Sequence, residues 1–171
     1  MRDIEDEDVN AMFAMDSDAE VHTFLGNKPI ATIAEAQKYI DSVKQQYQEN
    51  GIGRWAVVEK ESGEFIGWSG FRLITDVVNG KTQYYDLGYR LLKNHWGKGY
   101  ASEIALASLN HGFKELGLDE IVGIADVAHI ASNHILQKVG LHRVNEFMYE
   151  GIRHHFYILT KKEWENRKNG L

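Results

Sequence analysis

The segment from Leu87 to Glu103 constrains the fold more than any other part of the chain. It reads LGYRLLKNHWGKGYASE: a strand-like stretch, a turn with two glycines, and the start of a helical pattern. A helix start leaves N–H groups unpaired and carries a partial positive charge. Because glycines let the backbone approach an anion closely, this turn predicts a cradle for a pyrophosphate.

The same turn also has a purely structural interpretation. Gly97 and Gly99 are compatible with a simple tight turn between strand and helix, because short glycine patterns are common. The segment contains neither G-x-x-x-x-G-K-[ST] nor G-x-G-x-x-G, since the residue three after Gly99 is Ser102. The residues alone therefore leave both interpretations open.

Periodicity along the rest of the chain predicts a mixed arrangement of helices and strands. Helical spacing is found over residues 5–14, from Thr32 to about 49, after Gly99, over 131–139 and over 161–169. Strand patterns are found over residues 55–58, 65–74, 84–92, 121–125, 142–149 and 152–160. Thr32 and Glu35 have the spacing of a capping box. This order favours an α/β or α+β domain with a mixed sheet.

Size and composition are those of an ordinary globular protein. The chain has 171 residues, of which 43% are hydrophobic and 26% charged. Pro29 is the one proline, so no Pro-rich linker divides the chain, and we expect residues 1–171 to form a single domain. The absence of cysteine excludes a disulfide framework, a thiolate metal site and a cysteine nucleophile.

Charge and hydropathy narrow the expected partners. The formal net charge is −6, which disfavours nucleic acid as a partner and suits a cationic acceptor. No apolar run reaches the roughly 18 residues of a membrane span, and the charged first residues lack a signal-peptide core, so we expect a cytoplasmic protein without membrane contact. No metal is predicted, because the histidines lack ligand spacing; those inspected are His129, His134, His142, His154 and His155.

The glycine turn resembles a motif of the GCN5-related N-acetyltransferase (GNAT) family. Trp96–Ala101 matches the last glycine and the alanine of the family signature [QR]-x-x-G-x-[GA]. Trp96 stands at the position of Gln or Arg, which is similar to the W-G-K-G-Y-A of the RimJ/RimL-type branch. Residues Leu87–Leu91 resemble the fourth strand of that branch.

A second segment resembles the family's N-x-x-S-x-x-x-x-x-K-x-G-F motif. Ser132, Lys138 and Gly140 are in register with it, whereas His129 stands for the asparagine and Leu141 for the phenylalanine. The resemblance covers nearly the whole chain, although the family's first strand is expected to be absent or very short here.

The resemblance implies a fold and a cofactor. The fold is a single GNAT-like domain, with a central mixed, mostly antiparallel twisted sheet of six to seven strands flanked by helices. The cofactor is acetyl-CoA. The residues implied to hold it are Leu91, Leu92, Trp96, Gly97, Lys98, Gly99, Tyr100, Ala101, His129 and Ser132.

The resemblance also implies a reaction in which a primary amine attacks the thioester directly in a ternary complex. The acceptor is a protein N-terminus or a small amine. The Leu91 N–H is implied to stabilise the thioester oxygen, and Ser132 to protonate the departing thiolate, although Ser132 fits an N-cap equally well. Asp86 or Tyr84, which share one side of a strand, are candidates to take the amine proton; Asp86 also fits a solvated strand-edge carboxylate.

Two other function classes stay open at this level. One is a degenerate acyl-CoA-binding module without turnover, suggested by Trp96 and His129. The other is a nucleotide-phosphate-binding domain, disfavoured by the lack of a Walker-type lysine. We expect a monomer or a homodimer.

Overall fold

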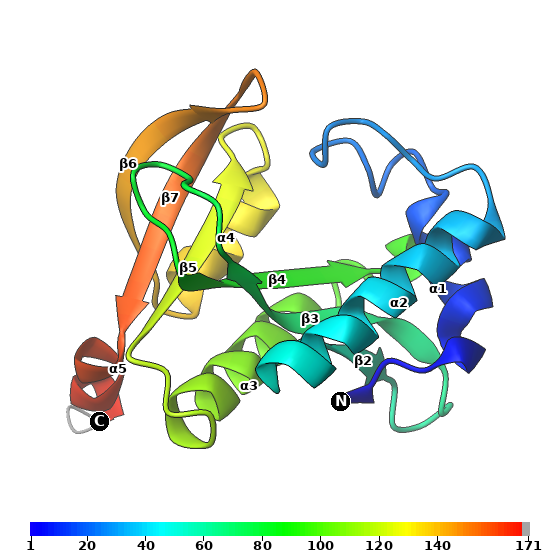
Figure 1. Cartoon of the computed structure of the whole chain (residues 1–171), viewed down its shortest axis with the longest axis horizontal. Helices are drawn as coiled ribbons and strands as arrows, with labels where there is room; N and C mark the ends of the chain where they lie inside the picture. Colours follow the sequence, from blue (N-terminus) through cyan, green and yellow to red (C-terminus); the bar gives the residue numbers. More distant parts are fainter. Residues whose placement is uncertain (169–171) are drawn as a thin grey trace.

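The computed structural model describes residues 1–168 and shows a twisted sheet with helices on both faces (Figure 1). The elements in chain order are β1 (Arg2–Asp3), α1 (Val9–Asp16), α2 (Ile33–Asn50), β2 (Arg54–Val58), β3 (Phe65–Ile74), β4 (Tyr84–Leu91), α3 (Tyr100–Lys114), β5 (Glu120–Asp126), α4 (Ile130–Lys138), β6 (His142–Tyr149), β7 (Ile152–Thr160) and α5 (Lys161–Lys168). Short 3₁₀ helices occupy Asp6–Asp8 and Lys93–His95. None of the described helices is long and apolar enough to cross a membrane.

The sheet has seven strands in the order β1-β2-β3-β4-β5-β7-β6. Every neighbouring pair is antiparallel except β4 and β5, which run parallel and are connected through α3. This confirms the predicted mixed, mostly antiparallel sheet of six to seven strands. β1 is only two residues long, as expected for a very short first strand.

Most element boundaries agree with the sequence patterns to within two residues. The predicted capping box is present at the start of α2, where Thr32 N–H donates to Glu35 Oε2 at 2.9 Å. The predicted first helix begins as a 3₁₀ turn and α1 continues to Asp16. The predicted last helix reached residue 169, which lies outside the described residues.

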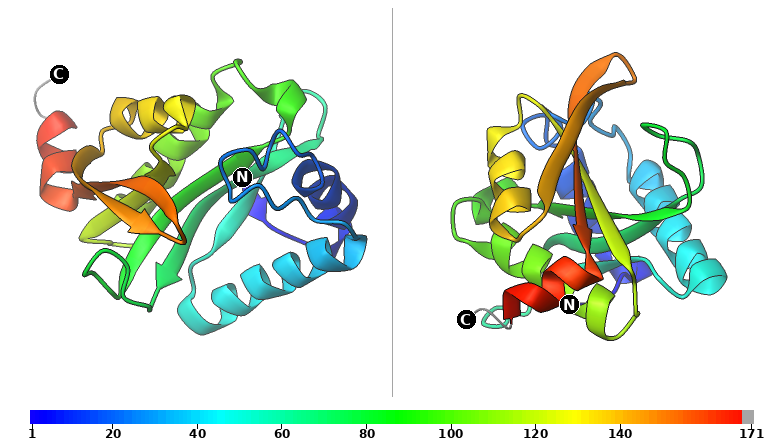
Figure 2. Two further views of the ribbon diagram at one scale, coloured as in Figure 1. Left: turned by 90° about the horizontal axis from the view of Figure 1, so that it is seen from above. Right: turned by 90° about the vertical axis from the view of Figure 1, so that its left-hand side faces the viewer.

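The two faces of the sheet carry different helices (Figure 2). On one face α1 and α2 pack against β2 and β3 through a cluster that includes Met15, Ile40 and Trp68. On the other face α3, α4 and α5 cover a cluster that includes Leu109 and Tyr157. We call these the α2 face and the α3 face.

Candidate active site

The parallel strands β4 and β5 pair only near their starts and then separate (Figure 1). Just two residue pairs join them, Tyr85 with Ile121 and Asp86 with Val122, although both strands continue for several residues. We call the unpaired stretch, residues 87–91 of β4 and 123–126 of β5, the β4–β5 fork. Asp86 lies at its apex.

Backbone donors of β4 point into the fork. Leu92 N–H donates to Ile66 O on the β3 side at 2.9 Å. Because successive N–H groups along a strand point to opposite edges, those of Leu91 and Tyr89 point toward β5, which has already moved away. The N–H predicted from the resemblance, that of Leu91, therefore has the required direction.

The glycine turn lies at the far end of β4 and opens into α3. Gly97 and Gly99 adopt φ of 71° and 88°, which side chains disfavour, and Gly99 is the N-cap residue of α3. A Cβ on either glycine would meet no atom within 4 Å, so the backbone there is open to an incoming group. Trp96 Nε1–H donates to Leu91 O at 2.9 Å and fixes the turn to the strand.

The other residues predicted around this turn differ in exposure and in the cluster they contact. Lys98 is exposed beside the helix start, and Tyr100 donates its hydroxyl hydrogen to Glu59 Oε1 at 2.7 Å. Ala101 is half-buried on the α3 face, next to Leu91. The Leu92 side chain instead packs with the α2-face cluster, so only its backbone is available to the turn.

The β5–α4 turn lies on the other side of the fork. His129 is the N-cap residue of α4 and Ser132 is the third residue inside the helix, so the alternative that Ser132 caps α4 is wrong. The Ser132 Oγ lies 3.1 Å from the Tyr89 hydroxyl, which also donates to Ser132 O at 3.2 Å. Burial raises the pKa of Tyr89 well above its usual value, so this phenol stays protonated.

The loop between α1 and α2 reaches across to the start of α4 (Figure 1). Phe24 of this loop stacks on the His129 ring, with centroids 4.5 Å apart and planes 14° from parallel. Burial lowers the pKa of His129, so the imidazole is neutral at pH 7 and one ring nitrogen can donate a hydrogen bond. The loop thereby fixes His129, which the resemblance places at the position of an asparagine.

Asn133, the neighbour of Ser132, uses its whole amide to hold this turn. Its Nδ2 donates to Asp126 O and His129 O, both at 2.8 Å. Its Oδ1 accepts hydrogen bonds from the Tyr157 hydroxyl and His155 Nδ1, both at 2.7 Å. Because Asn133, His155 and Tyr157 are buried, loss of the amide would leave the Tyr157 hydroxyl and His155 Nδ1 without their acceptor. Asp126 O and His129 O would keep backbone donors.

The α2 face of the fork carries the two candidates for the proton acceptor. Tyr84 is 4% exposed, packs edge-on against Phe156, and its hydroxyl is buried without a hydrogen-bond partner among the described residues. Asp86 is half-buried, and its Oδ1 is likewise buried and unpartnered. Burial raises the pKa of Tyr84 to about 12. It also raises the pKa of Asp86 to about 6, against the opposing effect of Arg54 and Arg72.

Comparison with known proteins identifies the family. A family model described as an acetyltransferase (GNAT) domain matches residues 1–142. The uncharacterized N-acetyltransferase YoaA of Bacillus subtilis (strain 168) is 31% identical over 153 residues, which cover 88% of this chain and 84% of YoaA. The chain belongs to the GNAT acetyltransferase family.

Solved GNAT structures share the fold at low sequence identity. A GNAT acetyltransferase from Bacillus anthracis has a TM-score of 0.78 at 21% identity, over 95% of this chain and 94% of that one. Spermidine N-acetyltransferase from Vibrio cholerae, solved with CoA and spermine, has a TM-score of 0.77 at 16% identity and covers 96% of both chains. These likenesses show a common fold.

Acetyl-CoA is the acetyl donor of the GNAT family, and the geometry fits it. The open backbone at Gly97 and Gly99, the N-terminus of α3 and the exposed Lys98 provide donors and positive charge for a pyrophosphate. The fork provides edge N–H groups for an extended chain such as pantetheine. Among the described residues, no group of three or more His, Cys, Asp or Glu side chains could hold a metal ion.

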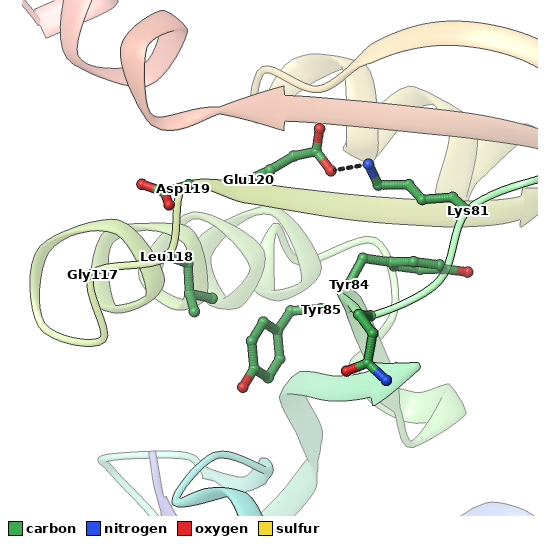
Figure 3. A pocket seen from close by; sticks show the side chains of 8 residues that line it. Lys81, Tyr84, Tyr85, Gly117, Leu118, Asp119 and Glu120 are labelled. Carbon is green, nitrogen blue, oxygen red and sulfur yellow. Dashed lines mark ion pairs between the residues drawn. The ribbon is translucent and has the colours of Figure 1, made fainter. Parts of the chain in front are cut away.

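A depression of about 320 Å³ lies at the opposite, paired end of β4 and β5 (Figure 3). Lys81 and Glu120 form an ion pair at 2.7 Å across it, and Tyr84 and Tyr85 form part of its wall. None of the residues of the glycine turn or the β5–α4 turn lines it. Of the candidate site residues only Tyr84 does, so the other candidates lie at the fork and the turns beside it and not at this depression.

Three residues at the fork were not among the sequence candidates. Tyr89 had a usable signal, because it alternates with Leu91 on the same side of the strand. Phe24 and Asn133 had none, since the loop of one and the helix of the other meet their partners only through the tertiary fold.

Proposed function

We propose that this GNAT protein transfers the acetyl group of acetyl-CoA to a primary amine, which attacks the thioester directly in a ternary complex. We also propose that it belongs to the RimJ/RimL-type branch, which the W-G-K-G-Y-A sequence of its glycine turn supports. The observation that carries the proposal is the β4–β5 fork, which opens beside the N-terminus of α3.

Each side of the fork has a task in binding the donor. Acetyl-CoA, when bound, supplies a thioester whose carbonyl carbon is open to attack. The N–H groups around Gly97 and Gly99, with Lys98, hold the pyrophosphate. Trp96 keeps this turn in place through its bond to Leu91 O. His129, held by Phe24, donates to the pantetheine arm in place of asparagine.

The α3 side of the fork also prepares the leaving group. The N–H of Leu91 points into the fork and stabilises negative charge on the thioester oxygen. Ser132 Oγ–H donates a proton to the departing sulfur, and the proton that the attacking nitrogen loses as the amide forms restores the hydroxyl. Tyr89 orients that hydroxyl, because its own hydroxyl contacts both oxygens of Ser132.

Asp86 is the proposed proton acceptor for the amine. With a pKa of about 6 it is mostly ionised at pH 7 and is a stronger base than an ordinary aspartate. It lies at the fork apex, on the face opposite the proposed coenzyme side. Tyr84, whose pKa of about 12 keeps it protonated, orients the acceptor by donating a hydrogen bond.

The acceptor is a protein N-terminus or a small amine. The fold shared with spermidine N-acetyltransferase of Vibrio cholerae, whose name gives a small amine as its acceptor, supports the second option. We further propose that residues 1–171 form one domain, which acts in the cytoplasm as a monomer or homodimer. The family model ends at residue 142, and β7 beyond it inserts between β5 and β6, which supports a single domain.

Thermal unfolding with acetyl-CoA, CoA or ATP tests this function before any acceptor is known. A ligand at a hundredfold its Kd stabilises the native state by about 2.7 kcal/mol. We expect acetyl-CoA and CoA to raise the melting temperature and ATP to leave it unchanged. Protection by ATP alone, or by none of the three, contradicts the proposal. Binding without thiol release across an amine panel would instead indicate a degenerate acyl-CoA-binding module.

A further inference from the structure

Three charged side chains lie together on the α2 face of the fork without pairing to one another. Arg72 of β3 is the direct cross-strand partner of Asp86 of β4. Arg54 of β2 lies one row away on the same face, because it is opposite Gly70, which is opposite Gly88. None of the three forms an ion pair within 4.0 Å with another described residue.

Arg72 and Asp86 form an open pair. Cβ atoms of directly opposite residues lie about 4.5–5.5 Å apart, a spacing at which opposite charges usually meet. Here Arg72 is exposed and has no hydrogen bond in the described part of the chain, while Asp86 keeps one oxygen buried and unpartnered. The carboxylate and the guanidinium therefore flank the fork apex with their bonding capacity unused.

Arg54 reaches the same place across a channel of glycines. Gly70 and Gly88 have no side chains, so the guanidinium lies over the sheet with Nη2 3.1 Å from the position of a Cβ on Gly88. It stacks on Trp68 at 4.3 Å and donates from Nη1 to the Tyr39 hydroxyl at 2.8 Å, which fixes its position. Its Nε is buried and has no hydrogen-bond partner in the described residues.

A neighbouring arginine on this face, Arg90, forms an ion pair within the fold. Arg90, two residues beyond Gly88, donates to Asp16 Oδ1 at 2.5 Å and also contacts Trp68. Its charge is thus neutralised within the fold. Arg54 and Arg72 form no such ion pair in the described part of the chain, and for the partly buried Arg54 an unpaired charge is costly. A ligand that brings both an anion and a cation would satisfy all three groups at the apex.

We propose that the acceptor is a free amino acid, whose ammonium group binds Asp86 and whose carboxylate binds Arg72 and Arg54. This inference rests on the proposed function and narrows its acceptor. An α-amino acid carries both charges on one carbon, which matches groups held on adjacent positions of the sheet. A polyamine fits poorly, because two unpaired arginines repel a second cation. A protein N-terminus lacks the carboxylate beside its amine.

Initial-rate measurements of thiol release test the acceptor class at saturating acetyl-CoA. The panel contains the common amino acids, each compared with its decarboxylated amine and with its carboxamide, which also stands for a protein N-terminus. We expect at least one amino acid to exceed both analogues about tenfold or more in kcat/KM, the size of a charged hydrogen bond. The α-amine of a carboxamide has a pKa near that of a chain terminus, about 8, and is readily deprotonated. A lower rate with the carboxamide would therefore not be explained by a less reactive amine.

Arg72→Gln tests whether Arg72 causes the preference for an amino acid over its decarboxylated amine. We expect the ratio of amino acid to amine to fall about tenfold, and Arg72→Glu to reverse it in favour of the amine. Arg167→Gln, an exposed arginine on α5, is the matched control and should keep the wild-type ratio. Arg72 is exposed, so these variants are expected to fold.

The outcomes separate this inference from the proposed function. Equal or better turnover of the decarboxylated amines or carboxamides overturns the amino-acid acceptor but leaves an acetyltransferase. A preference that Arg72→Gln keeps overturns the carboxylate site. Failure of every amino acid in a protein that acetyl-CoA stabilises thermally also overturns this inference. Failure of acetyl-CoA itself to stabilise the protein overturns the proposed function instead.

Discussion

The two faces of the β4–β5 fork are built from different parts of the polypeptide. On the α3 face, the proposed donor site uses mainly backbone groups of one continuous segment, from Leu91 through the glycine turn into α3. On the α2 face, the proposed acceptor site uses side chains from three strands, Arg54, Arg72 and Asp86. In this proposal, recognition of the constant cofactor rests mainly on the backbone, whereas recognition of a variable acceptor rests on replaceable side chains.

This difference has a physical reason. A pyrophosphate is recognised by N–H groups and a helix dipole, which every sequence that folds this way provides once glycines allow close approach. An acceptor is recognised by charge and shape, which depend on single residues exposed on a sheet face. Changes on the α2 face should therefore alter specificity while binding of the donor is retained, and changes in the glycine turn should remove both.

Gly99→Asp should have the largest effect, because it changes the proposed pyrophosphate-binding turn directly. The change forces a side chain into a φ of 88° and places a carboxylate at the helix N-terminus, where phosphate must bind. We expect CoA affinity to fall by at least about 100-fold, from repulsion between like charges a few ångströms apart plus strain. Isothermal titration with CoA measures it.

Gly99→Ala is the matched control for that variant. Its Cβ would meet no atom within 4 Å. The variant therefore adds the backbone strain of a side chain at this φ but adds no charge. We expect it to bind CoA within about tenfold of the parent, from a strain of roughly 1–2 kcal/mol. Equal binding by Gly99→Asp and the parent would refute the pyrophosphate assignment, whereas equal loss in both variants would show that the turn acts by shape alone.

Asp86→Asn should have the second-largest effect, and only on the acceptor side. Removing a general base typically slows turnover by at least about 100-fold, and CoA affinity should not change. In the parent, kcat/KM should fall as pH drops through about 6, the pKa of Asp86, because protonation removes the base. A profile with the same limb near pH 6 in Asp86→Asn would assign that limb to another group.

The same variant should stabilise the protein at neutral pH. The folded-state pKa of Asp86, about 6, lies above its ordinary value of 3.8 because burial disfavours the carboxylate. The native state therefore binds the proton more tightly than the unfolded chain, and this contribution to stability is lost as pH rises from about 4 to about 6. At pH 8 we expect Asp86→Asn to be more stable by roughly 1–3 kcal/mol, measured by urea unfolding; a loss of stability would contradict the buried-charge argument.

The contrast between the two faces also explains what the sequence revealed. The glycine turn could be singled out because its residues are consecutive, and the order of helices and strands along the chain followed from periodicity. Asp86 was found as a candidate from its alternation with Tyr84. Its relation to Arg54 was not, since the two are brought together only by the registers of β2 with β3 and β3 with β4.

Asn133→Leu should have an intermediate effect and tests a side chain that holds the β5–α4 turn on the donor side. The change removes one of the two donors to Asp126 O and to His129 O, each of which keeps a backbone N–H donor, and it leaves the Tyr157 hydroxyl and His155 Nδ1 without their amide acceptor. We expect the free energy of unfolding to fall by about 3 kcal/mol and CoA affinity to fall about tenfold. Hydrogen exchange in the first turn of α4 should rise in parallel.

Asn133→Asp separates the hydrogen bonds that Asn133 accepts from β7 from those that it donates to the β5–α4 turn. It keeps an oxygen for the Tyr157 hydroxyl and His155 but cannot donate to the two carbonyls of the turn. We expect weaker CoA binding and faster exchange in α4 than in the parent, with a smaller loss of stability than in Asn133→Leu. Unchanged CoA affinity in both variants would limit Asn133 to a role in stability.

Ser132→Ala should have the smallest effect and distinguishes the chemical step from CoA binding at the donor site. Because its hydroxyl is proposed to protonate the sulfur and not to hold the coenzyme, kcat should fall about tenfold while the Kd of CoA stays the same. Tyr89→Phe removes the hydroxyl that contacts both oxygens of Ser132, so it should lower kcat less and have little further effect once Ser132 is alanine. Additive losses in the double variant would mean that the two hydroxyls act separately, with Tyr89 contributing to the fork on its own. A loss of CoA affinity in Ser132→Ala would move Ser132 from the chemical step to binding.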